Sequence, residues 1–396
     1  MKVRIRKGDT LWYLAKLFNV PLRLVIDSNR KLNPSSPQVG SDIEIPAYKT
    51  EKYTIQKGDT FYKISQRRKL ALDALTIMNP DLSPSNLQIG QIITLPVRVV
   101  TPYVNPKMNY DSVTMMKNLR SLRQIYPFIR AKSIGNSVLG KSIPEIQIGN
   151  GEKKVHMNGA FHAQEWITTA VIMNFLNDYL LALTNKWMIR ALDMSPFYDG
   201  VTISIVPMVN PDGVDLVLNG PTECEYYKDY VLELNQGNTD FSGWKANIRG
   251  VDLNNQFPAE WEVEKPRKPQ APAPRDYPGE RPLSEPETIA MAELTRREDF
   301  DRTIAFHTQG EEIYWGYEGL EPPYAETIVN EFERVSGYKA VRYLDSYAGY
   351  KDWYIQEWQR PGYTVELGEG VNPLPLSQYD EIYQETLGIM LASLYM

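Results

Sequence analysis

The chain has 396 residues, of which 42% are hydrophobic and 23% charged, a composition typical of a folded globular protein with room for more than one domain. Its 43 basic and 49 acidic residues give a net charge of −6, which argues against nucleic acid as a partner because phosphate binding requires a basic surface. The single cysteine, Cys224, excludes an intrachain disulfide, and it is interpreted as an inert thiol because no histidine lies near it in the sequence.

The N-terminal residues carry no recognisable export signal. The opening MKVRIRKGDT leads directly into a folding pattern without an apolar core or a cleavage site, so we expect no signal peptide. The most apolar long stretch, 167–183, contains Asn174, Asn177 and Asp178 and predicts a core helix. No membrane insertion is therefore expected.

Two copies of one small unit occupy the N-terminal part of the chain. Residues 3–46 and 53–96 match without a gap at an offset of fifty residues. Each copy begins with an alternating strand and continues through a Gly-Asp-Thr turn that provides a helix cap, two short helices and a closing strand. The repeats predict two βααβ domains, over 1–48 and 49–97.

The polar residues shared by the two copies are candidates for ligand binding, although a Gly-Asp-Thr turn could equally be a structural cap. They are Gly8, Asp9, Thr10 and Asn29 in the first copy and Gly58, Asp59, Thr60 and Asn79 in the second. The openings GDTLW and GDTFY, the shared Asn and the closing Gly-x-x-Ile-x-(Ile/Leu)-Pro resemble LysM domains. This resemblance implies that both units bind glycans containing N-acetylglucosamine, and two copies would raise avidity.

A larger domain follows a short linker. Residues 98–108 contain Pro102 and Pro106 without periodicity and predict the linker, and a helix beginning near Asn109 opens a domain over 109–396. Predicted strands then alternate with helices, the strands at 154–158, 201–207, 303–307 and 362–366 and the helices at 167–183, 285–297, 324–336 and from about 378. This alternation predicts an α/β fold with a mixed central sheet flanked by helices.

One segment of this domain is rich in proline. Residues 265–286 have the low complexity typical of an exposed loop. The segment ends in Ser284-Glu285-Pro286-Glu287, where Ser-x-x-Glu with a proline inside the first turn is a helix-start signal.

Two of the three histidines follow predicted strands. His162 and Glu165 lie at a turn after the strand 154–158, and His307 ends the strand 303–307. Ligands in α/β folds bind at the carboxyl ends of strands, and imidazole and carboxylate groups suit zinc. These three residues are therefore a candidate catalytic zinc site with one open position. His156 lies within a strand and is interpreted as a core residue.

Glu366 ends a further predicted strand and lies between Val365 and Leu367. A carboxylate with apolar neighbours can have a raised pKa and serve as a general base and acid. A surface glutamate at a strand end is the alternative interpretation.

Five motifs in this order resemble the zinc metallocarboxypeptidases. They are His-x-x-Glu at 162–165, Asn-Pro-Asp-Gly at 210–213, Gly-Val-Asp-Leu-Asn at 250–254, His-Thr-Gln-Gly at 307–310 and Thr-Val-Glu-Leu-Gly at 364–368. The resemblance implies that His162, Glu165 and His307 bind one zinc ion and that Glu366 is the general base and acid. It also implies that Asp252 accepts a hydrogen bond from His162 and fixes the tautomer of that ring.

The sequence departs from this family at its substrate-binding positions. Asn254-Asn255 replaces an Asn-Arg pair whose arginine binds a substrate's terminal carboxylate, and this change favours endopeptidase action. Lys245 and Arg249 are alternative candidates for the cation that stabilises the tetrahedral oxyanion. Tyr347 is the candidate for the family's tyrosine that covers the substrate.

LysM repeats joined to such a domain resemble the bacterial γ-D-glutamyl-L-diamino acid endopeptidases, and in particular their sporulation-associated type I enzymes. The resemblance implies zinc-dependent hydrolysis of the bond between D-glutamate and meso-diaminopimelate or L-lysine in peptidoglycan stem peptides. The alternatives are a carboxypeptidase that trims stem peptides, a non-catalytic glycan-binding protein and a chitin-directed protein. We expect cytoplasmic synthesis in a sporulating cell, with later release to the wall or spore.

Overall fold

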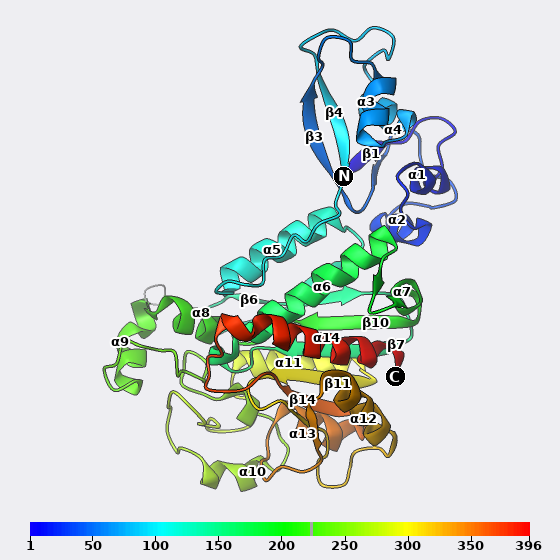
Figure 1. Cartoon of the computed structure of the whole chain (residues 1–396). Coiled ribbons are helices and arrows are strands. Elements are labelled where there is room, and N and C mark those ends of the chain that lie inside the picture. The colour runs from blue at the N-terminus through cyan, green and yellow to red at the C-terminus, as the bar shows by residue number, and fades with distance from the viewer. Residues whose placement is uncertain (222–224) are drawn as a thin grey trace. The chain divides into compact units, whose positions relative to one another are not determined.

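The computed structural model describes residues 1–221 and 225–396, which divide into two compact units (Figure 1). The first unit contains residues 1–103, 118–130 and 177–195, and the second contains residues 104–117, 131–176 and 196–396. Cys224, interpreted above as an inert thiol, lies outside the described residues.

The first unit contains the two repeats, and both adopt the predicted βααβ order. The first repeat comprises β1 (Lys2–Arg4), α1 (Leu11–Leu17), α2 (Leu22–Ser28) and β2 (Asp42–Glu44), and the second comprises β3 (Tyr48–Thr54), α3 (Phe61–Arg68), α4 (Leu72–Met78) and β4 (Ile92–Arg98). Within each repeat the two strands pair antiparallel. The predicted caps are present, since the Thr10 hydroxyl accepts from the Tyr13 amide at 3.0 Å and the Thr60 hydroxyl accepts from the Lys63 amide at 3.1 Å.

The second unit is built on an eight-stranded mixed sheet with the order β13-β12-β14-β11-β7-β10-β6-β5. Its strands are β5 (Arg130–Asn136), β6 (Ser142–Ile148), β7 (Lys153–Gly159), β10 (Val201–Val206), β11 (Arg302–His307), β12 (Glu312–Tyr314), β13 (Lys339–Val341) and β14 (Gly362–Glu366). Strand β7 runs parallel to β10 on one side and to β11 on the other, and β11 runs parallel to β14. Antiparallel pairs β6–β10 and β12–β14 make the sheet mixed, as predicted.

Helices flank this sheet, and in Figure 1 helix α14 passes in front of it. The helices are α5 (Ser112–Ile125), α6 (Ile167–Asn185), α7 (Ser195–Gly200), α8 (Pro211–Asn219), α9 (Glu225–Leu234), α10 (Trp261–Glu264), α11 (Pro286–Glu298), α12 (Tyr324–Ser336), α13 (Tyr350–Trp358) and α14 (Tyr379–Tyr395). Met291 of α11 and Trp353 of α13 share a core cluster with Phe161 and Ala305. Residues 163–185 are long and apolar enough to span a bilayer, but 89% of their most apolar window is buried inside the protein, as in a core helix.

The sequence-based prediction for the Pro-rich segment was wrong in one respect, and the helix start that it predicted is confirmed at Pro286. Residues 265–286 are not simply an exposed loop, because Tyr277, Pro278 and Gly279 are buried. Helix α11 is capped at Glu285 without a side-chain hydrogen bond, and the Ser284 hydroxyl instead donates to Gln256 and Glu285 at 3.0 Å each. Long-range contacts therefore take the place of a local side-chain cap.

Glu287, in the first turn of α11, is a buried carboxyl group that makes stability depend on pH. It is 0% exposed, and burial raises its pKa from 4.5 to about 8, against the opposing effect of the Val138 amide. Between pH 4.5 and pH 8 the Glu287 carboxyl group is ionised in the unfolded chain and protonated in the folded chain. The free energy of unfolding contributed by this group is therefore fully present below pH 4.5 and is lost as pH rises through 8.

We expect Glu287→Gln to reduce the loss of stability between pH 5 and pH 8.5 by roughly 2–4 kcal/mol, because an amide does not ionise. Urea unfolding of both proteins at the two pH values measures this difference. Glu293→Gln, an exposed change on the same helix, provides the matched control. Equal pH slopes for wild type and Glu287→Gln would contradict the prediction.

Candidate active site

The loop after β7 is fixed by hydrogen bonds to the start of α6 and to Asn210, which is distant in the sequence. The Ala160 amide donates to the Thr168 hydroxyl at 2.9 Å, which fixes the turn leading to His162. The Asn210 side chain donates to the carbonyls of Phe161 at 3.2 Å and Ala246 at 3.0 Å. The Asn-Pro-Asp-Gly motif thus joins the segment that carries His162 to the segment that carries Lys245.

The three predicted metal ligands lie together at the carboxyl ends of neighbouring strands. His162 and Glu165 follow β7, and His307 ends β11, which is paired with β7. Glu165 Oε1 lies 2.8 Å from His162 Nδ1, and Glu165 Oε2 lies 2.9 Å from His307 Nδ1. One donor atom from each residue falls within 4.8 Å of the other two, and all three residues are buried.

This cluster fits a metal cation in both its donor atoms and its charge. Burial alone would lower the pKa of His162, but Glu165 and Asp252 raise it to about 9. Burial alone would raise the pKa of Glu165, but His162 and His307 lower it to about 2. The surroundings therefore favour a positive charge among these groups, and two imidazoles with one carboxylate form a donor set suited to zinc.

Glu366 lies beside this cluster at the end of β14. In the parallel pairing of β11 with β14 it is the register partner of His307. Glu366 and His162 both line a cavity of about 200 Å³. Burial, followed by repulsion from Glu165, raises the pKa of Glu366 to about 8, as expected for a carboxyl group that exchanges protons near neutral pH.

A buried chain of charges extends from His162 to Lys245. His162 Nε2 lies 3.2 Å from Asp252 Oδ1, the contact that the sequence motif predicted. The Lys245 ammonium group lies 2.8 Å from Asp252 Oδ2 and 2.8 Å from Asp276 Oδ1. Burial alone would lower the pKa of Lys245, but the two aspartates raise it, so this lysine remains charged inside the cavity wall.

Sequence comparison assigns the domain that carries this site. The profile described as zinc carboxypeptidase matches residues 115–387, and the LysM domain profile matches residues 3–46 and 53–96. The chain belongs to the zinc carboxypeptidase family. It is a metallopeptidase, and its N-terminal units are LysM domains.

Two bacterial relatives of this zinc carboxypeptidase cover most of its length. The protein named gamma-D-glutamyl-L-diamino acid endopeptidase 1 from Lysinibacillus sphaericus is 62% identical over 396 residues and covers 100% of both chains. The uncharacterized protein YqgT from Bacillus subtilis (strain 168) is 47% identical over 297 residues, which are 74% of this chain and 79% of that protein.

Solved structures of low sequence identity show the same fold. Thrombin activatable fibrinolysis inhibitor (TAFI) aligns with a TM-score of 0.58 at 20% identity, covering 73% of this chain and 76% of that chain. Carboxypeptidase A from Helicoverpa armigera aligns with a TM-score of 0.55 at 15% identity, covering 88% and 97%. These alignments confirm the carboxypeptidase-like fold.

The structure separates the predicted substrate-binding residues into two groups. Lys245, Asn254 and Asn255 line the same cavity as Glu366. Asn254 Oδ1 also accepts from the Tyr350 amide at 3.0 Å, which ties the cavity to the start of α13. Among the described residues that line the cavity the cations are lysines, and no arginine is present.

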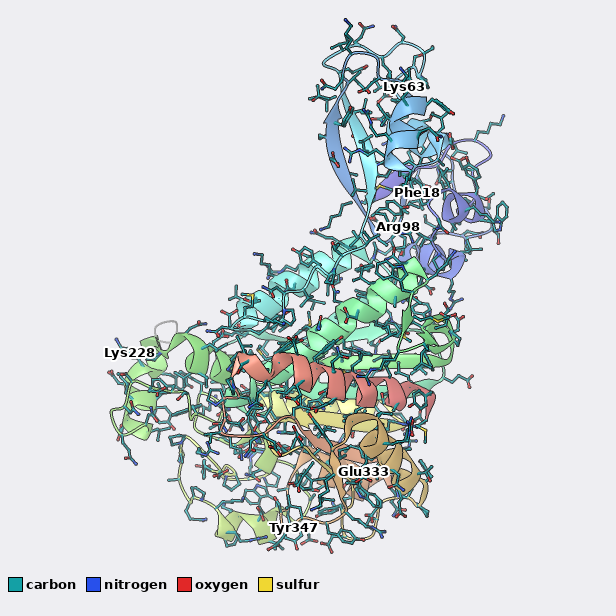
Figure 2. All side chains as sticks on the ribbon, in the orientation of Figure 1. Phe18, Lys63, Arg98, Lys228, Glu333 and Tyr347 are labelled. Carbon is teal, nitrogen blue, oxygen red and sulfur yellow. The ribbon has the colours of Figure 1, made fainter. Side chains whose placement is uncertain are left out.

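The predictions for Arg249 and Tyr347 need correction, because neither lines the cavity. The Arg249 guanidinium group points to Glu285, 3.5 Å away, so of the two candidate cations only Lys245 faces the site. The Tyr347 ring packs on Tyr317, with ring centroids 6.3 Å apart, and Figure 2 shows it near the lower edge of the view.

Sequence reasoning missed several polar residues of the cavity wall. These are Lys268, Tyr314, Lys351 and Asp352. Lys351 Nζ lies 2.5 Å from Asp352 Oδ1, and Lys268 Nζ lies 3.0 Å from Glu264 Oε1, so each lysine has a carboxylate partner. Lys351 and Asp352 directly precede Trp353 in the motif from which Tyr347 was predicted. Their place in that motif was the sequence signal that could have identified them as cavity residues.

In the LysM domains the structure also corrects two predicted glycan-binding residues. The Asn29 amide donates to the carbonyls of Val25 and Glu44, at 2.7 and 2.9 Å, and its oxygen accepts from the Glu44 amide at 2.8 Å. Asn79 makes the equivalent contacts in the second repeat. Both side chains therefore fasten the second helix to the closing strand, and we remove them from the predicted glycan surface.

The remaining predicted glycan residues belong to the Gly-Asp-Thr turns. Gly8 and Gly58 have positive φ angles of 90° and 84°, a conformation that favours glycine in both turns. The Asp9 carboxylate is held by Arg6 at 3.0 Å, and the Asp59 carboxylate by Arg67 at 2.9 Å. The aromatic residues that follow the turns, Trp12 and Tyr62, are 57% and 63% exposed.

Proposed function

We propose that this chain hydrolyses the γ-D-glutamyl–L-diamino acid bond of peptidoglycan stem peptides, with meso-diaminopimelate or L-lysine as the diamino acid. The observation that carries the proposal is one cavity in which His162 of the ligand cluster meets Glu366 and Lys245, and whose described lining residues include no arginine. The full-length similarity, at 62% identity, to a protein named for this activity supports the choice of bond.

His162, Glu165 and His307 would hold a single zinc ion in this proposal. When bound, zinc supplies Lewis acidity that polarises the scissile carbonyl group and makes water a better nucleophile. Glu366 accepts a proton from the attacking water and returns it to the leaving amine. Lys245 stabilises the negative charge that develops on the carbonyl oxygen, because its ammonium group lines the cavity and remains charged.

The cavity favours endopeptidase action over carboxypeptidase action. Recognition of a free C-terminus is best served by the bidentate fork of an arginine, and asparagine has no charge and a shorter reach. Asn255 occupies that position of the motif and lines the cavity. The other wall lysines, Lys268 and Lys351, are already paired with Glu264 and Asp352.

We further propose that the LysM domains bind the glycan strand to which the stem peptides are attached. The exposed Trp12 and Tyr62 beside the two Gly-Asp-Thr turns support this proposal, since aromatic faces provide large contact areas for a ligand with polar edges. Two such units on one chain raise the effective concentration of the polymer at the protein.

Digestion of defined tripeptide and tetrapeptide stems, followed by mass measurement of the products, tests the proposed bond. We expect L-alanyl-D-glutamate together with a fragment that begins with the diamino acid. Release of only the C-terminal residue from the tetrapeptide stem would establish the carboxypeptidase alternative, because both activities release the C-terminal diamino acid from the tripeptide. Absence of both bound zinc and turnover would support the alternative of a non-catalytic glycan-binding protein.

A further inference from the structure

The Pro-rich segment 268–278 forms a wall of the active site through backbone hydrogen bonds to the segment 243–252. The amides of Lys245 and Ala246 both donate to the Pro274 carbonyl, at 2.9 and 3.0 Å. The Asp252 amide donates to the Tyr277 carbonyl at 2.7 Å. Because these contacts involve main-chain groups, they hold the backbone of Lys245 and Asp252 in place.

Side chains of the same segment reach the cavity and the residue next to a metal ligand. Lys268 lines the cavity directly. Arg275 Nη1 donates to Gln164 Oε1 at 3.0 Å and to the Gly243 carbonyl at 3.1 Å, and Gln164 precedes Glu165. The segment therefore contacts both the loop after β7 and the segment 243–252.

Asp276 makes the contact with the most direct chemical consequence. Its Oδ1 accepts from Lys245 Nζ at 2.8 Å. Asp252 Oδ2 lies at the same distance of 2.8 Å. An ammonium group has three N–H donors. Asp276 takes one of them in a hydrogen bond, and Asp252 attracts the ammonium charge through an ion pair, so an N–H of the group is left for the cavity that Lys245 lines.

We propose that Asp276 is a positioning residue that holds the Lys245 ammonium group so that an N–H of that group points at the reacting oxygen. The inference rests on the proposed function, because it specifies how Lys245 acts in that reaction. A lysine side chain is flexible and its three donors rotate freely, so a single partner leaves its direction undefined. A second carboxylate fixes the donor before the substrate arrives, and fixed donors stabilise developing charge best.

The test combines variants of Asp276 and Lys245 in a double-mutant cycle, with kcat and KM measured separately. We expect Asp276→Asn to lower kcat by about 10-fold and Lys245→Met by about 100-fold, with KM nearly unchanged, because the interaction forms in the transition state. Asp276→Glu should restore most of the activity, since it retains the charge. The double variant should be no slower than Lys245→Met alone, since Asp276 acts through Lys245.

Zinc content and Tm are measured on every variant, and Glu280→Gln, an exposed change in the Pro-rich run 265–286, is the matched control. Any one of three outcomes would overturn the inference. They are a wild-type kcat in Asp276→Asn, losses of kcat that multiply in the double variant, and a loss of zinc that accounts for the loss of activity. If the wild type cleaves a peptide bond other than the proposed one, the proposed function fails. The ratios of kcat between the wild type and the variants, measured on that bond, then still decide the role of Asp276.

Discussion

Replacing Glu366 with glutamine is expected to lower kcat for stem-peptide hydrolysis by about 10³-fold, within the range that general acid–base catalysis provides. Glu366 lines the cavity with His162, and burial together with Glu165 raises its pKa to about 8. Glutamine has nearly the same size but cannot accept a proton from water or return one to the leaving amine. Steady-state kinetics on one defined stem peptide measure the loss.

Two controls make this result specific to proton transfer. Glu369→Gln removes an exposed carboxylate three residues further along the chain and should leave kcat close to that of the wild type. The zinc content of Glu366→Gln should also match that of the wild type, because Glu366 is not one of the clustered ligands. Wild-type activity in Glu366→Gln would refute the assignment of Glu366 as the base.

The dependence of kcat/KM on pH provides a second readout for the same side chain. A general base must be ionised, so activity falls as pH falls through the pKa of Glu366. That pKa is about 8 in the metal-free protein, and a cation held by the ligand cluster favours the ionised carboxylate and lowers it. The acidic limb of the profile should therefore lie below pH 8 in the wild type and be absent from Glu366→Gln.

The sheet that presents these groups was predictable because its central strands carry a local signal. Predicted strands at 154–158, 303–307 and 362–366 correspond to β7, β11 and β14, whose residues are mostly buried. Apolar runs of this kind follow from burial on both faces of a parallel sheet. By contrast β5, at the edge of the sheet, has exposed and half-buried residues, and its composition gave no comparable signal.

The Pro-rich segment was mispredicted because its contacts are non-local. Composition identified 265–286 as an exposed loop, yet Asp276 and the carbonyl of Pro274 bind the Lys245 segment about thirty residues earlier in the chain. The choice between Lys245 and Arg249 as the cation that stabilises the oxyanion also depended on the path of the folded backbone. They are four positions apart in the chain, and only the folded backbone determines which cation faces the cavity.

Exact repetition was an ambiguous guide in the LysM domains. Asn29 and Asn79 recur at the same offset as the Gly-Asp-Thr turns, but each amide bonds the backbone of its own repeat. A buried polar group that closes a small fold is retained as strictly as a binding residue, because leaving its partners unpaired costs about 1–3 kcal/mol. Repetition alone therefore does not separate the two roles.

Removing one metal ligand is expected to have an effect at least as large as removing the base. His307→Ala deletes one of three clustered donors and leaves Glu165 with a single imidazole partner. Loss of a residue that merely orients a ligand costs about 10–100-fold in metal affinity or activity, so loss of a ligand should exceed about 100-fold. Metal analysis should find about one zinc per wild-type chain and little in His307→Ala.

Chelation of the wild-type protein should reproduce the inactive state of His307→Ala, and added zinc should restore only the wild type. Magnesium should not substitute, because it favours oxygen donors and two of the three donors here are imidazole nitrogens. Glu366→Gln distinguishes the two kinds of loss, since it should retain zinc while its kcat stays about 10³-fold below that of the wild type. If His307→Ala kept both its zinc and its activity, the cluster of His162, Glu165 and His307 would not be the catalytic metal site.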